Sequence, residues 1–249
     1  MSCNVRGRGS PGLIYHSRVR SPVRRTTIAA LLVLPLLSAC GDGEETTADP
    51  DGTCAYGDAT AEAAKDVSRP AAEPDPDAPT EVTISTDRGA IKVALDPDKA
   101  PCTVNSFLHL ADEGYFDNTQ CHRLVTSGIF VLQCGDPTAT GSGGPGYQFD
   151  DELLDNDPRL TNCGEQQTPQ GPISLCTYPA GTVAMANAGP GTNGSQFFLV
   201  YKDSPLPPAY TVFGRMSAGG LSVVSKVAKD GVDTNGVAPK TSVTITGVK

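Results

Sequence analysis

Arg123 and Gln133 are the polar residues whose surroundings in the sequence suggest chemistry. Phe130 and Val131 stand just before Gln133, and the run 185–198 adds glycine, asparagine and alanine residues that are followed by two phenylalanines. An arginine stays charged at physiological pH and can only donate hydrogen bonds, whereas a glutamine side chain both donates and accepts them. This set of residues indicates a groove that binds an extended peptide without activating a nucleophile.

Other motifs of known chemistry stand in the wrong context. Residues 141–146 (GSGGPG) match the G-x-G-x-x-G pattern of dinucleotide-binding loops, but they contain Pro145 and no apolar helical pattern follows them. A serine hydrolase would have to use His122, yet the chain has no G-x-S-x-G elbow and Ser195 lies in a strand-like stretch. We interpret the acidic run 150–152 as a solvated turn and not as an acid/base pair. Dinucleotide binding and serine hydrolysis are therefore disfavoured.

The elements that must position the candidate groove are mostly strands. Two apolar stretches with period-two alternation, 82–84 and 91–95, flank a short turn and predict a hairpin. Further strands are predicted at 121–126, 129–134, 181–187, 196–201, 210–215 and 241–247. Helices are predicted from Pro101 to Gly114 and over 219–229, where apolar residues recur at helical spacing. The pattern predicts a mainly β fold, a closed eight-stranded antiparallel barrel capped by two helices.

The N-terminal part differs in composition from the rest of the chain. Arginines precede an apolar run at 28–37, as in an export signal, and the sequence LSAC that ends at Cys40 is typical of a bacterial lipobox. We expect a lipoprotein signal peptide over 1–39 and a lipid on the cysteine, with a chance cysteine after an ordinary secretory signal as the alternative. Residues 40–80 are acidic and have almost no large apolar side chains, so we expect a disordered tether. The folded domain should then span 81–249.

Charge and ligand spacing argue against two further classes of function. Residues 40–249 carry 13 basic and 28 acidic side chains, whereas nucleic-acid binding needs a basic face. The chain has no Cys-x-x-Cys pair, and only His109 and His122 follow the leader, which disfavours structural zinc. We therefore expect neither a nucleic-acid partner nor a metal.

Six cysteines follow the lipobox, and export would leave them free to form disulfides. Cys163 and Cys176 stand close together in the sequence, so we favour a bond between them. Cys121 and Cys134 flank two strands that should pair antiparallel, which would bring them within bonding range.

Two cysteines leave alternatives open. Cys102 is a rival partner for Cys121, and Cys54 either pins the tether to the domain through a disulfide or remains a free thiol. Buried thiols that pack as small apolar side chains are the alternative to bonds at Cys102, Cys121 and Cys134.

Five stretches of the predicted domain carry a family resemblance. They are CHRL at 121–124, LQCGD at 132–136, GSGGPG at 141–146, MANAGPGTNGSQFF at 185–198 and YTVFGR at 210–215. Together they resemble the cyclophilin peptidyl-prolyl isomerases, over about residues 81–249. The resemblance implies a cyclophilin-like fold and isomerisation of X-Pro peptide bonds, with no cofactor.

The resemblance also implies roles for individual residues. Arg123 matches the family's catalytic arginine, which would donate a hydrogen bond to the prolyl nitrogen, and Gln133 matches the glutamine that orients it. Phe198 completes the catalytic set, while His122 is interpreted as a scaffold residue. The other matching positions line the family's proline pocket or hold the peptide: Phe130, Val131, Ala186, Asn187, Gln196, Leu206 and Tyr210.

The chain departs from the family pattern at several places. The loop between Arg123 and Gln133 is two residues longer than in the best-known members, and residues 153–178 resemble an insertion. Pro205 stands where many members have a tryptophan, and Tyr210 where they have a histidine. Tyr210 keeps an aromatic wall and a hydroxyl, so we expect catalysis to survive.

The resulting expectation is an isomerase that acts on proline-containing peptides and unfolded exported proteins. It would be a monomer held by its lipid at the extracytoplasmic face of the cell membrane. The alternatives are a non-catalytic proline-peptide-binding or chaperone module and a lipoprotein whose barrel is only a scaffold. Arg123, Gln133 and Phe198 together favour the isomerase, because a scaffold needs no lone arginine among apolar residues.

Overall fold

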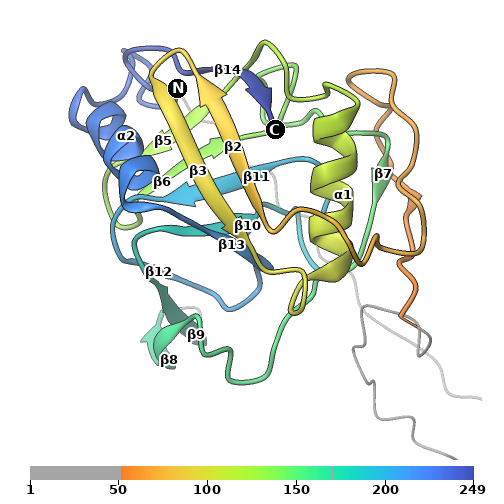
Figure 1. Cartoon of the computed structure of the whole chain (residues 1–249). Helices are drawn as coiled ribbons and strands as arrows, with labels where there is room; N and C mark the ends of the chain where they lie inside the picture. Colours follow the sequence, from red (N-terminus) through yellow and green to blue (C-terminus); the bar gives the residue numbers. More distant parts are fainter. Residues whose placement is uncertain (1–51, 170) are drawn as a thin grey trace, which may run out of the picture. The chain divides into compact units, whose positions relative to one another are not determined.

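A curved antiparallel sheet of nine strands organises the computed structural model, which describes residues 52–169 and 171–249 (Figure 1). The strands are β2 (Glu81–Thr86), β3 (Gly89–Leu95), β4 (Thr119–Gln120), β5 (Arg123–Val125), β6 (Val131–Cys134), β10 (Thr182–Met185), β11 (Phe197–Val200), β13 (Val212–Met216) and β14 (Thr244–Val248). Their order in the sheet is β4-β14-β2-β3-β13-β10-β11-β6-β5. The predicted hairpin forms with Ile84 opposite Ile91, and each further strand predicted from the sequence is present.

The sheet is a strongly curled half-barrel, and the prediction of a closed eight-stranded barrel is wrong. Its edge strands, β4 and β5, are separated in the chain only by Cys121 and His122, which carry the backbone from one edge to the other. No ladder joins β4 to β5 within the described residues. The Leu124 N–H in β5 instead donates to the carbonyl oxygen of Val237 at 2.8 Å. A loop from the C-terminal region therefore stands where a closing strand pair was expected.

Two helices pack against the sheet, as predicted. Helix α1 (Pro101–Asp112) begins with a proline, whose fixed φ and missing N–H suit the first helical position. Helix α2 (Ala218–Lys229) begins after Ser217, whose hydroxyl accepts a hydrogen bond from the N–H of Gly220 at 3.1 Å. Both helices contribute buried apolar side chains to one core with the sheet, and they are Val104, Phe107, Leu110, Val224 and Val227.

Strand β11 divides the apolar interior into two clusters. Successive side chains of a strand point to opposite faces, so Phe197 and Leu199 join the main core while Phe198 and Val200 join a second, smaller cluster. The second cluster lies under the predicted proline pocket. Because both faces of β11 are buried, all of its residues are apolar and do not alternate with polar ones.

Residues 52–72, which we call the strap, differ from the disordered tether expected over 40–80. Strand β1 (Gly57–Asp58) pairs with β7 (Tyr147–Gln148), and Figure 1 shows the strap in orange beside α1. The ring of Tyr56 packs edge-on against Tyr147 and Phe149, with centroids 5.6 and 5.5 Å apart. One aromatic side chain and a series of backbone hydrogen bonds thus order a segment of low hydrophobicity. Residues 40–51 and the leader, including Cys40, lie outside the described residues.

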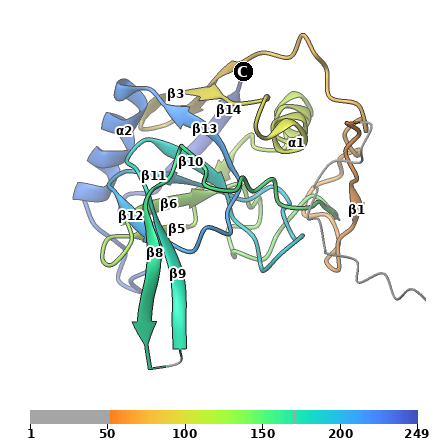
Figure 2. The same ribbon diagram turned by 90° about the horizontal axis from the view of Figure 1, so that it is seen from below.

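The predicted insertion contains a long hairpin of β8 (Thr161–Thr168) and β9 (Gly171–Tyr178). It forms a separate three-stranded sheet in the order β12-β9-β8, where β12 is Ser204–Leu206. Figure 2 shows the hairpin extending away from the large sheet, and most of its side chains are exposed. Its residues are largely polar and show no apolar alternation, so these strands could not be predicted from the sequence.

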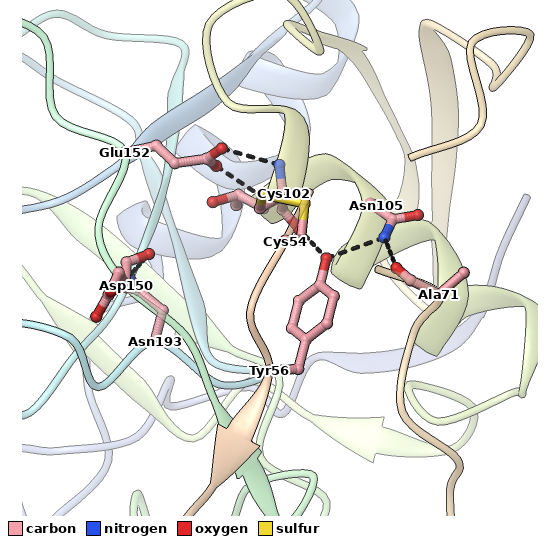
Figure 3. The surroundings of a disulfide bond; sticks show 9 residues. Cys54, Tyr56, Ala71, Cys102, Asn105, Asp150, Glu152 and Asn193 are labelled. Atoms are coloured by element: carbon pink, nitrogen blue, oxygen red, sulfur yellow. Dashed lines mark hydrogen bonds between the residues drawn. A yellow bond between two sulfur atoms is a disulfide. The ribbon is translucent and has the colours of Figure 1, made fainter. Parts of the chain in front are cut away.

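The six cysteines of the described domain form three disulfides. Cys121–Cys134 and Cys163–Cys176 confirm the two favoured pairs. Cys102 bonds to Cys54 and not to Cys121, so the strap is pinned to the second residue of α1 (Figure 3). The alternatives of unpaired thiols and of a free Cys54 are both wrong.

Candidate active site

Arg123 and Gln133 lie directly opposite each other on β5 and β6. The Nη1 of Arg123 donates a hydrogen bond to the Oε1 of Gln133 at 3.2 Å. The Cys121–Cys134 disulfide closes the same strand pair immediately beside them. The antiparallel register therefore brings together two side chains that are ten residues apart in the sequence.

A pocket of about 190 Å³ adjoins this pair. Its walls include eight of the predicted site residues, and these are Arg123, Val131, Gln133, Ala186, Asn187, Phe198, Leu206 and Tyr210. The rings of Phe198 and Tyr210 meet edge-on with centroids 5.5 Å apart. An arginine thus stands at the rim of a small pocket whose walls are mostly apolar and aromatic.

Phe130 is a predicted pocket residue that the structure places elsewhere. Its ring packs against Tyr201, with centroids 5.9 Å apart, and the Nζ of Lys202 lies 4.3 Å from its centroid. Ile129 lines the pocket instead. Side chains two residues apart share a face of a strand, so counting back from Gln133 through Val131 would have indicated Ile129.

Gln196, another predicted site residue, does not line this pocket but contacts Gln133, which does. Its Oε1 accepts a hydrogen bond from the Nε2 of Gln133 at 2.9 Å. Its Nε2 donates to the carbonyl oxygens of Gly141 and Gly143, both at 3.0 Å. These contacts fix the orientation of both amides, so the acceptor oxygen of Gln133 points at the guanidinium of Arg123.

The acidic run 150–152 is not a solvated turn, because Asp151 and Glu152 are buried. Asp151 accepts hydrogen bonds from the side chains of Asn187 and Asn193, at 3.0 and 2.9 Å, and so shapes the loop that borders the pocket. Glu152 accepts the N–H groups of Cys102 and Thr103, both at 2.8 Å, at the start of α1. Neither acid lines the pocket beside Arg123. Asp151 instead holds the loop next to that pocket, and Glu152 holds the start of α1.

Glu152 supplies the cap that α1 lacks at its own N-terminus. Burial raises the pKa of this carboxyl group overall, although the hydrogen bonds from Thr103 and Cys102 offset part of the rise. The positive end of the helix dipole is a favourable place for a carboxylate. This role of Glu152 could not be predicted from the sequence, because its two partners are about 50 residues away.

His122, next to the arginine, is buried and stays neutral. Burial lowers the pKa of its imidazole, while the carboxylate of Asp136 raises it and the nearby charge of Arg123 lowers it. Within the described part of the chain, neither ring nitrogen has a hydrogen-bond partner. Ser195 donates to the carbonyl oxygen of Gly135 at 2.7 Å, so no serine–histidine pair forms.

Residues 52–169 and 171–249 contain no group of three or more histidine, cysteine, aspartate or glutamate side chains that is placed to hold a metal ion. None of the helices in these residues combines the length and apolar character needed to cross a membrane.

The geometry and the sequence agree with one family. Residues 81–249 match the profile described as cyclophilin type peptidyl-prolyl cis-trans isomerase/CLD, and the chain belongs to this family.

Curated relatives and solved structures point the same way. The chain is 47% identical over 212 residues to the "Probable peptidyl-prolyl cis-trans isomerase B" of Mycobacterium tuberculosis (strain ATCC 25618 / H37Rv), covering 81% of this chain and 65% of the relative. The protein of the same name from Mycobacterium leprae is 47% identical over 206 residues, with 79% and 66% covered. The chain thus spans slightly less than two thirds of these relatives.

A solved structure supports the fold assignment. The cyclophilin type isomerase of Cryptosporidium parvum superposes with a TM-score of 0.55 at 31% identity, covering 68% of this chain and 95% of that one. A second structure of that protein was determined in the presence of the dipeptide Ala-Pro and gives the same TM-score and identity.

Proposed function

We propose that this domain catalyses cis-trans isomerisation of X-Pro peptide bonds. The observation that carries the proposal is the hydrogen-bonded pair of Arg123 and Gln133 at the rim of a small apolar pocket. The family membership, the names of the mycobacterial relatives and the Ala-Pro dipeptide of the Cryptosporidium structure support it.

The pocket explains how the reaction would be accelerated. Rotation about the peptide bond has a barrier of ~18–20 kcal/mol, which comes from delocalisation of the nitrogen lone pair. With the proline ring held against Phe198 and Leu206, the guanidinium of Arg123 can donate to the prolyl nitrogen as that atom pyramidalises. Gln133 holds the guanidinium in place. No covalent bond forms and no proton is transferred, so the mechanism is compatible with a neutral His122.

The decisive test is a protease-coupled isomerisation assay on a short X-Pro peptide. Arg123→Ala should lower kcat/KM by about 10²- to 10³-fold, because it removes a charged donor aimed at the transition state. Arg123→Lys should not restore the rate, since an ammonium group lacks the planar fork of donors.

Arg88→Ala is a matched control, because Arg88 is also exposed but lies in the turn between β2 and β3. Wild-type turnover in Arg123→Ala would refute the catalytic role. Peptide binding by the wild type without any turnover would indicate a non-catalytic binding module.

We further propose that the protein acts as a monomer on exported proteins, anchored by a lipid on Cys40 at the extracytoplasmic face of the membrane. The LSAC motif supports the anchor. The three disulfides support export, because such bonds persist in oxidising compartments. Partition of the full-length chain into a detergent phase, together with mass analysis of its N-terminus, would test the anchor.

A further inference from the structure

The loop of residues 126–130 connects β5 to β6, the two strands that carry Arg123 and Gln133. Its length is one of the places where the chain departs from the family pattern. Its last two residues, Ile129 and Phe130, are half-buried and lead directly into β6. The position of these two residues decides which side chain reaches the pocket beside Arg123, which we call the catalytic pocket.

Ile129 and Phe130 lie on opposite faces of the large sheet. Ile129 lines the catalytic pocket and packs against the smaller apolar cluster, to which Phe198 belongs. The ring of Phe130 packs edge-on against Tyr201, and Tyr201 packs against the main core. Since successive side chains of an extended chain alternate between faces, a shift of one residue at this place would exchange the two side chains.

Both backbone groups of Phe130 are held by the residues that follow β11. Its N–H donates a hydrogen bond to the Oγ of Ser204 at 2.8 Å. Its carbonyl oxygen accepts from the N–H of Tyr201 at 3.0 Å, which extends the ladder of β6 and β11 one residue beyond the pair of Val131 and Val200. These two bonds fix the register of the chain at the point where it enters the pocket wall.

Ser204 is a rigid acceptor for this loop. It is fully buried and begins β12, which pairs with β9 so that Ser204 lies opposite Tyr178. Its hydroxyl group accepts from the N–H of Phe130 and donates to the carbonyl oxygen of Lys202 at 2.8 Å. A hydroxyl can do both at once, so the orientation of this group is set by the protein before a peptide binds.

Tyr201 and Lys202 hold the same loop from the side away from the pocket. The hydroxyl of Tyr201 donates to the carbonyl oxygen of Val125, the last residue of β5, at 2.7 Å. The Nζ of Lys202 lies 4.3 Å from the centroid of the Phe130 ring, a cation–π contact that favours the position of the ring outside the pocket. The segment after β11 therefore contacts the loop at both of its ends.

The register affects how a proline ring is held. Ile129 stands with Val131 and Phe198 in the wall of the catalytic pocket. A phenyl ring in the place of Ile129 would be larger and would fill part of the volume of about 190 Å³. Arg123 lies on β5 and stays opposite Gln133 in either register of the loop. A change of register should therefore alter the binding of proline more than the chemical step.

We propose that Ser204 is a positioning residue of the isomerase, which acts through the N–H of Phe130 to fix the register in which Ile129 forms the pocket wall. Tyr201 and Lys202 support this register by holding the ring of Phe130 outside the pocket. Ile129 thereby determines the shape of the proline site in this chain. The inference rests on the proposed isomerase function.

Ser204→Ala tests the proposal, because it removes the acceptor for Phe130 without adding volume. The assay measures kcat and KM separately on a short X-Pro peptide. KM should rise about five- to tenfold while kcat stays within about twofold, since the contacts that hold the proline change and the guanidinium of Arg123 does not. An unchanged KM in folded Ser204→Ala would overturn this inference alone. Failure of the wild type to isomerise the peptide would overturn the proposed function as well.

Ser106→Ala is the matched control. Ser106 is also a buried serine, and its hydroxyl is hydrogen-bonded to that of Tyr147 at 2.9 Å, but it lies on α1 and does not line the catalytic pocket. Both serine variants should lower the melting temperature, whereas only Ser204→Ala should raise KM. An equal rise of KM in the two variants would show a general loss of stability and would overturn the proposal.

The exchange of side chains gives a second readout. In the wild type, Ile129→Ala should raise KM at least threefold, and Phe130→Ala should change it less than twofold. In the Ser204→Ala background this order should be reversed, because the two side chains then compete for the same place. The same order in both backgrounds would overturn the register. If Ser204→Ala does not fold, the single variants decide, and equal effects of Ile129→Ala and Phe130→Ala on KM would overturn the proposal.

Discussion

The strap and the β8–β9 hairpin both lie outside the nine-stranded sheet, and a disulfide closes each of them. The hairpin bond joins residues 13 apart on paired strands, whereas the strap bond joins residues 48 apart. The first therefore stabilises a local structure that its own backbone ladder already forms. The second attaches a segment that has little regular structure of its own.

The two segments also differ in what they contact. The strap is attached to the loop of residues 141–146, which faces Gln196 and the catalytic pair. The hairpin adjoins the catalytic pocket at its base, where Cys176 lies opposite Leu206 of β12. The strap therefore reaches the catalytic pair through backbone hydrogen bonds to a loop, whereas the hairpin reaches the pocket through the packing of its base, where Tyr178 meets the rings of Phe198 and Tyr210.

Removal of the two disulfides should give the largest effects and should distinguish the segments. Cys54→Ser with Cys102→Ser should lower the free energy of unfolding by about 4 kcal/mol, and Cys163→Ser with Cys176→Ser by about 3 kcal/mol, because a longer loop gains more entropy when it is released. Both strap cysteines are buried, whereas only Cys176 of the hairpin pair is buried and Cys163 is exposed, which increases the difference. Urea unfolding monitored by circular dichroism measures both values.

The same variants separate stability from activity. The hairpin variant should keep wild-type kcat/KM on the X-Pro peptide, while the strap variant should lower it, because the strap holds the loop that Gln196 contacts. A larger loss of stability in the hairpin variant, or a fall in kcat/KM caused by it, would contradict the comparison.

Asp136→Asn should give a smaller effect that depends on pH. Asp136 is buried, and its carboxylate accepts hydrogen bonds from Thr138 and from the N–H of Gly141, at 2.7 Å each. Asp136 therefore holds the start of the loop of residues 141–146, and the strap holds the end of the same loop. Burial raises the pKa of this carboxyl group, but the hydrogen bonds from Thr138, Gly143 and Gly141 outweigh it, and the pKa is lowered overall. At neutral pH the variant should lose about 1–3 kcal/mol of unfolding free energy.

The sign of the pH dependence follows from the lowered pKa. The folded state releases this proton more easily than the unfolded state, so the stabilisation is complete above the usual aspartate pKa of about 3.9 and is lost as the pH falls through the folded-state pKa. The stability curves of the wild type and Asp136→Asn should therefore converge below about pH 4. Thr138→Val, which removes only one donor, should show a smaller difference at pH 7, and parallel curves down to low pH would contradict the assignment.

The elements of the large sheet and the catalytic pair could be predicted from the sequence because their signals are carried by side chains. Alternation at 82–84 and 91–95 reports burial of one face, and the polar pair Arg123 and Gln133 stands out among apolar neighbours. Ile129 was not predicted as a pocket residue, because the loop before it is longer than in the best-known members and its alignment with the family was therefore uncertain.

The strap and the buried acids could not be predicted, because the groups that hold them are backbone groups or side chains from distant segments. Ala59 and Ala64 contribute N–H groups, which every residue but proline has, and no side-chain pattern indicates which carbonyl oxygen they bind. Asp151 and Glu152 look solvated in the sequence because their hydrogen-bond donors come from distant segments. The composition of a segment indicates whether apolar side chains will bury it. It does not indicate that a buried carboxylate will accept hydrogen bonds from N–H groups elsewhere in the chain.

Ile173→Ser should give the smallest effect and tests whether the hairpin is independent of the site. Ile173 is 41% exposed and lies opposite Gln166 on β8, away from the hairpin base. The free energy of unfolding should change by no more than about 0.5 kcal/mol, as is usual for exposed positions, and kcat/KM on the X-Pro peptide should be unchanged. Leu206→Ala is the contrasting variant, because Leu206 lines the catalytic pocket at the hairpin base, and its kcat/KM should fall. A loss of more than threefold in Ile173→Ser would mean that the outer part of the hairpin also contacts the substrate.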